Sequence, residues 1–160
     1  ERNDFDHLAG LSAQFPLLEE SARATKVGIG VATGADKVYV RKGLDSGIEA
    51  ECQLPLLMAA DIQPQFLSWS EHYLINPFSD ADDGSLRDLG RYPGLAAFFT
   101  RNAEILLKRY VAGKHAEAWY RTIDRVRGSL TATPPLDIPD IQAGGVVGFD
   151  PGSFYTHHNV

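Results

Sequence analysis

The chain has 160 residues, of which 44% are hydrophobic and 22% charged, a composition typical of one soluble globular domain with a buried core. No apolar run approaches the roughly 20 residues that cross a bilayer, and the single cysteine, Cys52, excludes an internal disulfide and suits a reducing, cytoplasmic compartment. The net charge of −6 argues mildly against a nucleic-acid binder. However, residues 101–130 carry 7 basic and 3 acidic side chains, so one basic segment lies between two acidic ones.

Helical spacing of apolar residues predicts a first helix over residues 15–24. From Lys26 the period changes to two, which is typical of a strand. Two alternating runs, 26–31 and 38–40, are joined by the letters TGAD and predict a β-hairpin. In this turn Gly34 would supply a positive φ.

Further strands are predicted over residues 47–54 and 71–78, the second of which is closed by Pro77. The clearest helix is predicted over residues 94–113, after a proline that suits a helix start and before a glycine that suits a helix end. A shorter helix over residues 114–126 carries more basic side chains.

The C-terminal part favours a strand over residues 136–141 and a last hairpin over 146–160 that turns at the letters DPGS. Strands, then one long helix with one or two shorter helices, then strands again indicate an α+β fold. We therefore expect a mixed or antiparallel sheet core with hairpins.

The glycine-rich stretch around Gly34 does not match a phosphate-binding loop. Such a loop consists of a glycine, four further residues and then Gly-Lys-Ser/Thr. Here Lys37 lies three residues after Gly34 instead of directly after it, and Val38 follows in place of serine or threonine. The glycines at 28, 30 and 34 also lack dinucleotide-fingerprint spacing. A small-molecule enzyme that uses this stretch stays open as a lesser alternative, which nucleotide-induced thermal stabilisation would support.

Metal-ligand and catalytic patterns are also weak. His157 and His158 are adjacent, so in a strand they would point to opposite faces, which is unfavourable for joint metal binding. The acidic run over residues 80–83 lacks the final glutamate of a calcium loop. The letters NPF from Asn76 resemble part of a methyltransferase loop, but the second proline is missing, which favours a strand end. We expect no catalytic residue, metal or cofactor within this chain.

Residues 118–128 combine two aromatic side chains, Trp119 and Tyr120, with three arginines. Such a mixture can serve nucleic acid, because guanidinium groups pair with phosphates and rings stack on bases. Equally, the aromatics can belong to the core and the arginines to a solvated surface. The residues alone leave both interpretations open.

Several segments follow one another in the order typical of one domain: GVATGADKVYV, AADI, HYLINPF, YPGLAAFF…LLKRY and AWYR. In this order the chain resembles the TaqI-like C-terminal specificity domain of adenine-N6 DNA methyltransferases and combined restriction–modification enzymes. Ala60 departs from the pattern, because the family has glycine there. The resemblance covers residues 15–160, which would be a C-terminally truncated recognition domain, and leaves residues 1–14 as a linker from a missing catalytic domain.

The resemblance implies that the chain reads a DNA target sequence. A separate N-terminal domain of the same parent chain would bind S-adenosylmethionine and methylate the target adenine. The expected partners are double-stranded DNA and that catalytic domain. The residues that we expect to contact DNA are Thr33, Lys37, Lys108, Arg109, Lys114, Arg121, Arg125 and Arg127. The main alternative is a protein–protein docking domain without DNA contact.

Overall fold

The computed structural model describes residues 28–64, 66–79, 84–127, 131, 135–140 and 145–160. The predicted linker over residues 1–14, the helix over 15–24 and the acidic run over 80–83 lie outside these residues. The described part is α+β, which confirms the predicted fold class.

The main sheet has four strands in the order β1-β5-β2-β8. They are β1 (Val40–Lys42), β2 (Gln53–Leu57), β5 (His72–Ile75) and β8 (Tyr155–Thr156). Strand β5 runs antiparallel to both its neighbours, whereas β8 runs parallel to β2. Strand β5 confirms the strand that was predicted over residues 71–78. The one predicted over 47–54 is wrong for most of its length, because residues 50–52 form a 3₁₀ turn and β2 begins only at Gln53.

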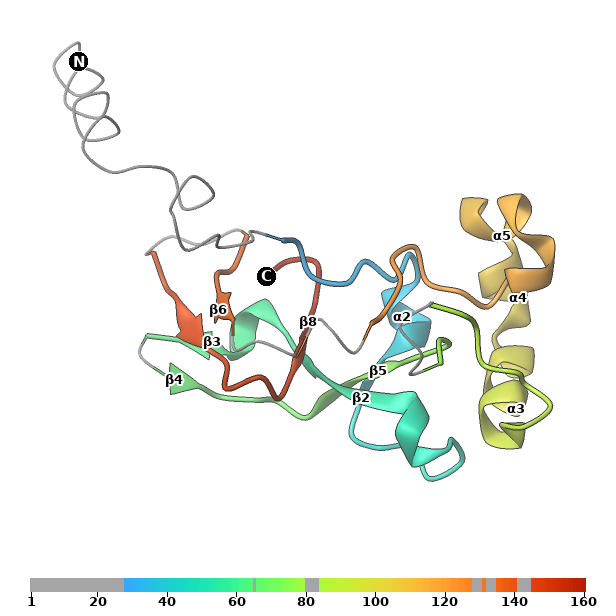
Figure 1. Ribbon diagram of the computed structural model, residues 1–160, viewed down its shortest axis with the longest axis horizontal. Helices are drawn as coiled ribbons and strands as arrows, with labels where there is room; N and C mark the ends of the chain where they lie inside the picture. Colours follow the sequence, from blue (N-terminus) through green and yellow to red (C-terminus); the bar gives the residue numbers. More distant parts are fainter. Residues whose placement is uncertain (1–27, 65, 80–83, 128–130, 132–134, 141–144) are drawn as a thin grey trace, which may run out of the picture.

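Two small ladders accompany this sheet. One pairs β3 (Ile62–Gln63) with β4 (Phe66–Leu67), and the other pairs β6 (Leu136–Asp137) with β7 (Gly148–Phe149). Figure 1 shows the ladders at one end of the molecule and the longer helices at the other. Short 3₁₀ turns lie at η2 (Ala50–Cys52), η3 (Ala59–Asp61) and η4 (Ala116–Ala118).

The core lies between the main sheet and the first long helix. Leu56, Leu74 and Ile75 of the sheet are fully buried, as are Leu95 and Phe99 of the helix. All belong to one apolar cluster. Burial of such side chains contributes about 1.5–3 kcal/mol each, so this cluster fixes how the helices sit against the sheet.

The hairpin predicted between residues 26 and 40 is wrong. Gly34 does have the predicted positive φ, at 73°, but the chain then enters the short helix α2 (Asp36–Tyr39). The Thr33 hydroxyl accepts a hydrogen bond from the Ala35 N–H and donates one to the Asp36 carboxylate, which favours a helical turn. The N-terminal run pairs instead through Val31, which forms a single parallel bridge with His157.

The long helix predicted over residues 94–113 consists of three successive helices: α3 (Pro93–Arg101), α4 (Ala103–Leu107) and α5 (Tyr110–Lys114). The start at the proline is as predicted. Continuity fails because the Asn102 side-chain amide donates to the Phe98 carbonyl, and because Arg109 has extended backbone with ψ of 146°. Among the described residues, no helix is long and apolar enough to span a membrane.

The shorter helix predicted over residues 114–126 is also wrong. After Lys114, which ends α5, only the turn η4 forms, and residues 121–127 are irregular. Trp119 and Tyr120 leave the helical path because their rings pack on Phe99, with centroid separations of 6.5 and 5.4 Å. The aromatics of this segment therefore pack against the core, which is the second of the two interpretations left open by the sequence.

Two expectations for the C-terminal segment are corrected as well. Strands β7 and β8 do not form a hairpin, because β7 pairs with β6 and β8 pairs with β2. The adjacent histidines do not point to opposite faces: β8 ends at Thr156, and the rings of His157 and His158 lie with centroids 4.1 Å apart.

Candidate nucleic-acid interface

Three segments that are distant in sequence meet at one place, which we call the junction: residues 32–37, 109–115 and 121–125. The Ile123 N–H donates to the Thr33 carbonyl at 3.2 Å, and the Asp124 N–H donates to the Ala32 carbonyl at 3.0 Å. The Ala32 N–H donates in turn to the Asp124 carboxylate at 2.9 Å. These bonds hold the arginine-bearing loop against the turn before α2, so the fold joins segments that each carry basic residues and lie far apart in the sequence.

Arg109 lies at the centre of the junction, and its guanidinium points into the protein. Its Nη1 donates to the Thr33 carbonyl at 3.2 Å, and its Nη2 donates to the Trp119 carbonyl at 2.8 Å and to the Tyr39 hydroxyl at 3.1 Å. Burial raises the pKa of Tyr39 to about 12, although the nearby guanidinium acts to lower it. Tyr39 therefore remains a neutral phenol that donates to the Tyr120 carbonyl.

Thr33 is also placed inside the fold. It is fully buried, and its hydroxyl serves the turn before α2. A side chain in this position has no surface from which to contact a duplex. We therefore leave Thr33 out of the contact set that we propose below.

Three of the expected residues, Lys37, Lys114 and Arg125, are exposed and belong to the three segments of the junction, whereas Arg121 is half-buried. The Arg125 side chain lies beside Gly84. The ammonium group of Lys114 lies 4.8 Å from the centre of the ring of Tyr110, which is 78% exposed. Cations with an exposed ring suit contact with phosphates and bases. The exposed carboxylates of Asp36 and Asp124 lie among them and limit the positive field.

Beside these cations lies a mostly apolar hollow of about 430 Å³. It is lined by Gly34, Arg109, Tyr110, Val111, Lys114, His115 and Ile123. Its walls come from all three segments of the junction. The hollow therefore exists only because the three segments meet.

The remaining two expected residues lie apart from the centre of the junction. Lys108 directly follows α4 and is exposed, and its ammonium group pairs with the Glu104 carboxylate of that helix at 2.8 Å. Arg127 is exposed on the irregular segment beyond the junction.

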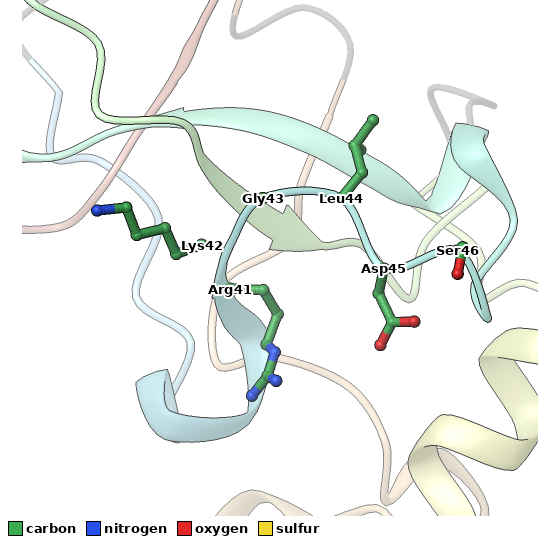
Figure 2. A pocket seen from close by; sticks show the side chains of 6 residues that line it. All are labelled: Arg41, Lys42, Gly43, Leu44, Asp45 and Ser46. Carbon is green, nitrogen blue, oxygen red and sulfur yellow. The ribbon is translucent and has the colours of Figure 1, made fainter.

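Two further exposed cations, Arg41 and Lys42, were not among the expected residues. They end β1 and line a shallow polar hollow of about 280 Å³ with the residues of the following turn. Figure 2 shows their side chains pointing to different sides of this turn, as expected for neighbours in a strand. The available signal was the pair of cations directly before Gly43, whose φ is 74°.

The NPF stretch is a strand end, as predicted. It directly follows β5, and the Asn76 side-chain oxygen accepts a hydrogen bond from the Phe78 N–H at 3.0 Å. Both side chains are buried, at 3% and 2% exposed. The asparagine therefore stabilises a turn inside the protein.

The amino-acid sequence of the chain is similar to known proteins, although not to a protein-family profile. No protein-family profile matches the chain. However, the chain is related to a region of proteins described as Type II methyltransferases, and it spans only about a quarter of their length.

The relatives include the methyltransferase M.BstVI of Geobacillus stearothermophilus, which is 42% identical over 96% of the chain and 27% of the relative. M.PaeR7I of Pseudomonas aeruginosa is 41% identical over 94% of the chain and 25% of the relative. M.XhoI of Xanthomonas vasicola is 39% identical over 94% of the chain and 27% of the relative.

Proposed function

We propose that this chain is the DNA target-recognition part of a Type II methyltransferase. The observation that carries the proposal is the junction: three separate segments, each with an exposed cation, are joined there in a chain whose relatives are Type II methyltransferases. In this function, S-adenosylmethionine binding and methyl transfer to adenine belong to a region beyond these 160 residues. The specificity role follows the resemblance to TaqI-like recognition domains.

The proposed contacts divide into two kinds. Lys37, Lys114 and Arg125 are exposed and would pair with phosphates, which sets the register of the protein on the duplex. Tyr110 and the hollow beside it would face the groove, where apolar contacts and stacking read the bases. Arg121 would support this surface from its half-buried position, while Arg109 holds its own segment against Thr33 and Trp119.

The proposal is tested by reversing charge at the junction. We expect the Lys114→Glu and Arg125→Glu double variant of the 160-residue chain to bind a DNA duplex at least about tenfold more weakly at low salt, because two phosphate contacts become repulsive. Fluorescence anisotropy with a labelled duplex measures the affinity. The matched control is Arg91→Glu, an exposed cation on another segment, which should change affinity by less than about twofold. Equal losses in both variants would contradict the assigned surface.

A docking function is the second candidate, and one observation favours it. Phe66, Leu136 and Phe149 of the two small ladders are 59%, 67% and 63% exposed. Leu136 and Phe149 are cross-strand partners, so their side chains share one face of the ladder. If the chain showed no DNA affinity at low salt while substitutions on this face abolished association with the rest of its parent protein, docking would be the better account.

A further inference from the structure

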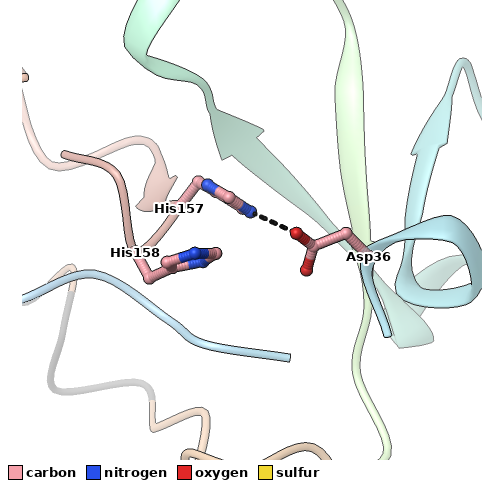
Figure 3. Close-up of side chains that lie close together, drawn as sticks. All are labelled: Asp36, His157 and His158. Atoms are coloured by element: carbon pink, nitrogen blue, oxygen red, sulfur yellow. Dashed lines mark hydrogen bonds and ion pairs between the residues drawn. The ribbon is translucent and has the colours of Figure 1, made fainter. Parts of the chain in front are cut away.

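Asp36, His157 and His158 form a cluster where the start of α2 meets the segment that follows β8 (Figure 3). Each side chain offers one ligand atom, a carboxylate oxygen or an imidazole nitrogen, and these three atoms lie within 4.8 Å of one another. The aspartate and the histidines are about 120 positions apart in the chain, so the cluster is a product of the tertiary fold.

The backbone fixes both histidines in place. The His157 N–H donates to the Leu57 carbonyl at 3.0 Å, and the His158 N–H donates to the Val31 carbonyl at 3.2 Å. These backbone bonds attach His157 to strand β2 of the main sheet and His158 to the run through Val31. A site built on such a ladder holds its ligand atoms more accurately than one built on a free loop.

The spacing of two ligand atoms already suits a metal. Nε2 of His157 lies 3.2 Å from Oδ2 of Asp36. Two ligands of a tetrahedral zinc ion, each with a bond of about 2.0–2.1 Å, lie roughly 3.3–3.4 Å apart. The Thr33 hydroxyl donates to the other oxygen, Oδ1, and so orients the carboxylate. Hydrogen bonds of this kind to a ligating group are a usual feature of metal sites.

The two rings also carry polar atoms that the described structure does not satisfy. His157 is only 3% exposed, and its Nδ1 has no hydrogen-bond partner among the described residues. The Nδ1 of His158 is likewise buried without a partner in this part of the chain. Buried polar atoms are nearly always paired, and a metal ion on Nδ1 of His158 would satisfy that atom. Coordination through Nε2 of His157 would leave its Nδ1 without a partner among the described residues.

We propose that Asp36, His157 and His158 bind a divalent transition-metal ion of the zinc class. Two imidazoles and one carboxylate are a known zinc donor set, and three protein ligands leave a fourth position for water. The ion would connect α2 to the segment after β8 and so fix both ends of the described chain. The competing account is an Asp36–His157 ion pair that needs no metal.

The test uses the 160-residue chain after treatment with a chelator and its removal. We expect one equivalent of Zn²⁺ to bind, and the melting temperature to rise by about 5–10 °C once the free ion exceeds its dissociation constant a hundredfold. Calorimetric titration gives the stoichiometry. Co²⁺ should bind at the same site, compete with Zn²⁺ and show the visible absorption of tetrahedral cobalt.

His158→Ala and Asp36→Asn should each abolish the metal-dependent rise and the cobalt absorption. His115→Ala is the control, because it removes an exposed histidine outside the cluster, and it should keep both signals. The cobalt spectrum is read at low temperature, so it reports on the site even where a variant melts early. The proposal is overturned if the wild-type chain shows no saturable shift, or if the two cluster variants retain it.

Discussion

Arg109 uses all three nitrogen atoms of its guanidinium inside the protein. Besides the bonds of Nη1 and Nη2 described above, its Nε donates to the Leu106 carbonyl at 3.2 Å, and its charge lies over the Tyr39 ring at 5.3 Å from the centroid. A planar fork with five donors can make these bonds simultaneously, whereas a lysine ammonium cannot. The residue therefore connects the end of α4 to the turn before α2 and to Trp119, which lies just before the third segment of the junction.

Arg109→Ala should lower the free energy of unfolding by about 2–3 kcal/mol, because it leaves carbonyls and a phenol without their charged donor. Arg109→Lys should recover little of this loss. Urea denaturation monitored by circular dichroism measures both. If Arg109→Ala weakened DNA binding while the free energy of unfolding stayed the same, the side chain would be a direct contact and not a structural one.

Asp137 is the clearest pH-sensitive residue among those described. Burial, and secondarily the charge of Asp150, raise its pKa to about 6. Its Oδ2 has no hydrogen-bond partner in the described part of the chain. Asp150 is better stabilised, because its carboxylate accepts hydrogen bonds from the N–H groups of Gly152, Ser153 and Phe154.

A carboxyl whose pKa is raised by folding holds its proton longer in the folded state than in the unfolded state, so stability falls as pH rises from about 4 to about 6. Asp137→Asn removes this charge. We expect the variant to be about 1–2 kcal/mol more stable than the wild type at pH 7, with no gain at pH 4. Thermal denaturation at the two pH values measures the difference. Asp140→Asn, at an exposed site, is the control and should show no such dependence.

At the scale of elements, α3 begins against a carboxylate from elsewhere in the fold. The Glu49 side chain accepts hydrogen bonds from the Gly94 and Leu95 N–H groups at 2.8 and 2.9 Å. Burial acts to raise the pKa of Glu49, but hydrogen bonds from backbone N–H groups outweigh it and the pKa is lowered. Helix N-termini favour negative charge, so this contact both caps α3 and attaches it to the segment before β2.

Removing this cap should loosen α3. We expect Glu49→Ala to cost about 1–2 kcal/mol of unfolding free energy, and Glu49→Gln less, since the amide oxygen still accepts one hydrogen bond. Glu51→Ala, at a nearby exposed carboxylate, is the matched control. Similar effects of Glu49→Ala and Glu51→Ala on chemical denaturation would show that the cap contributes nothing.

Helix and strand boundaries could be predicted where the residue that sets them acts on its own stretch of backbone, and not where tertiary contacts set them. The end of β5 and the start of α3 follow from Pro77 and Pro93, which act on their own backbone. The break at Asn102 was missed because apolar spacing continues across it. The helical turn α2 was missed because Val38 and Tyr39 have strand-like propensity, while tertiary burial decides their conformation.

The site was predictable in composition but not in geometry. The basic segment includes Lys114, which lines the hollow at the junction, but contact of its residues with DNA stays a prediction. The structural use of Arg109 depends on Thr33, which is 76 positions away, so no local pattern could reveal it. The same holds for the cluster of Asp36 with the two histidines, because their proximity arises from the pairing of Val31 beside His157.

At the scale of the whole molecule, the two ends of the described chain meet. The run through Val31 lies beside the segment after β8, and the Gly30 N–H donates to the Val160 carbonyl. A Cβ atom at Gly30 would lie 2.3 Å from the His157 carbonyl oxygen, so only glycine allows this approach. The run that leads into the junction at Ala32 is thus fixed against the segment after β8.

The most direct test of the DNA-recognition account is the dependence of duplex affinity on salt, measured for the 160-residue chain by fluorescence anisotropy. Three or four phosphate contacts predict a slope of log K against log salt of about −3 to −4. Lys114→Glu should make that slope shallower by about one unit or more. A chain with no measurable affinity at 50 mM salt, a condition chosen to favour phosphate binding, would contradict the account, as would a slope that Lys114→Glu leaves unchanged.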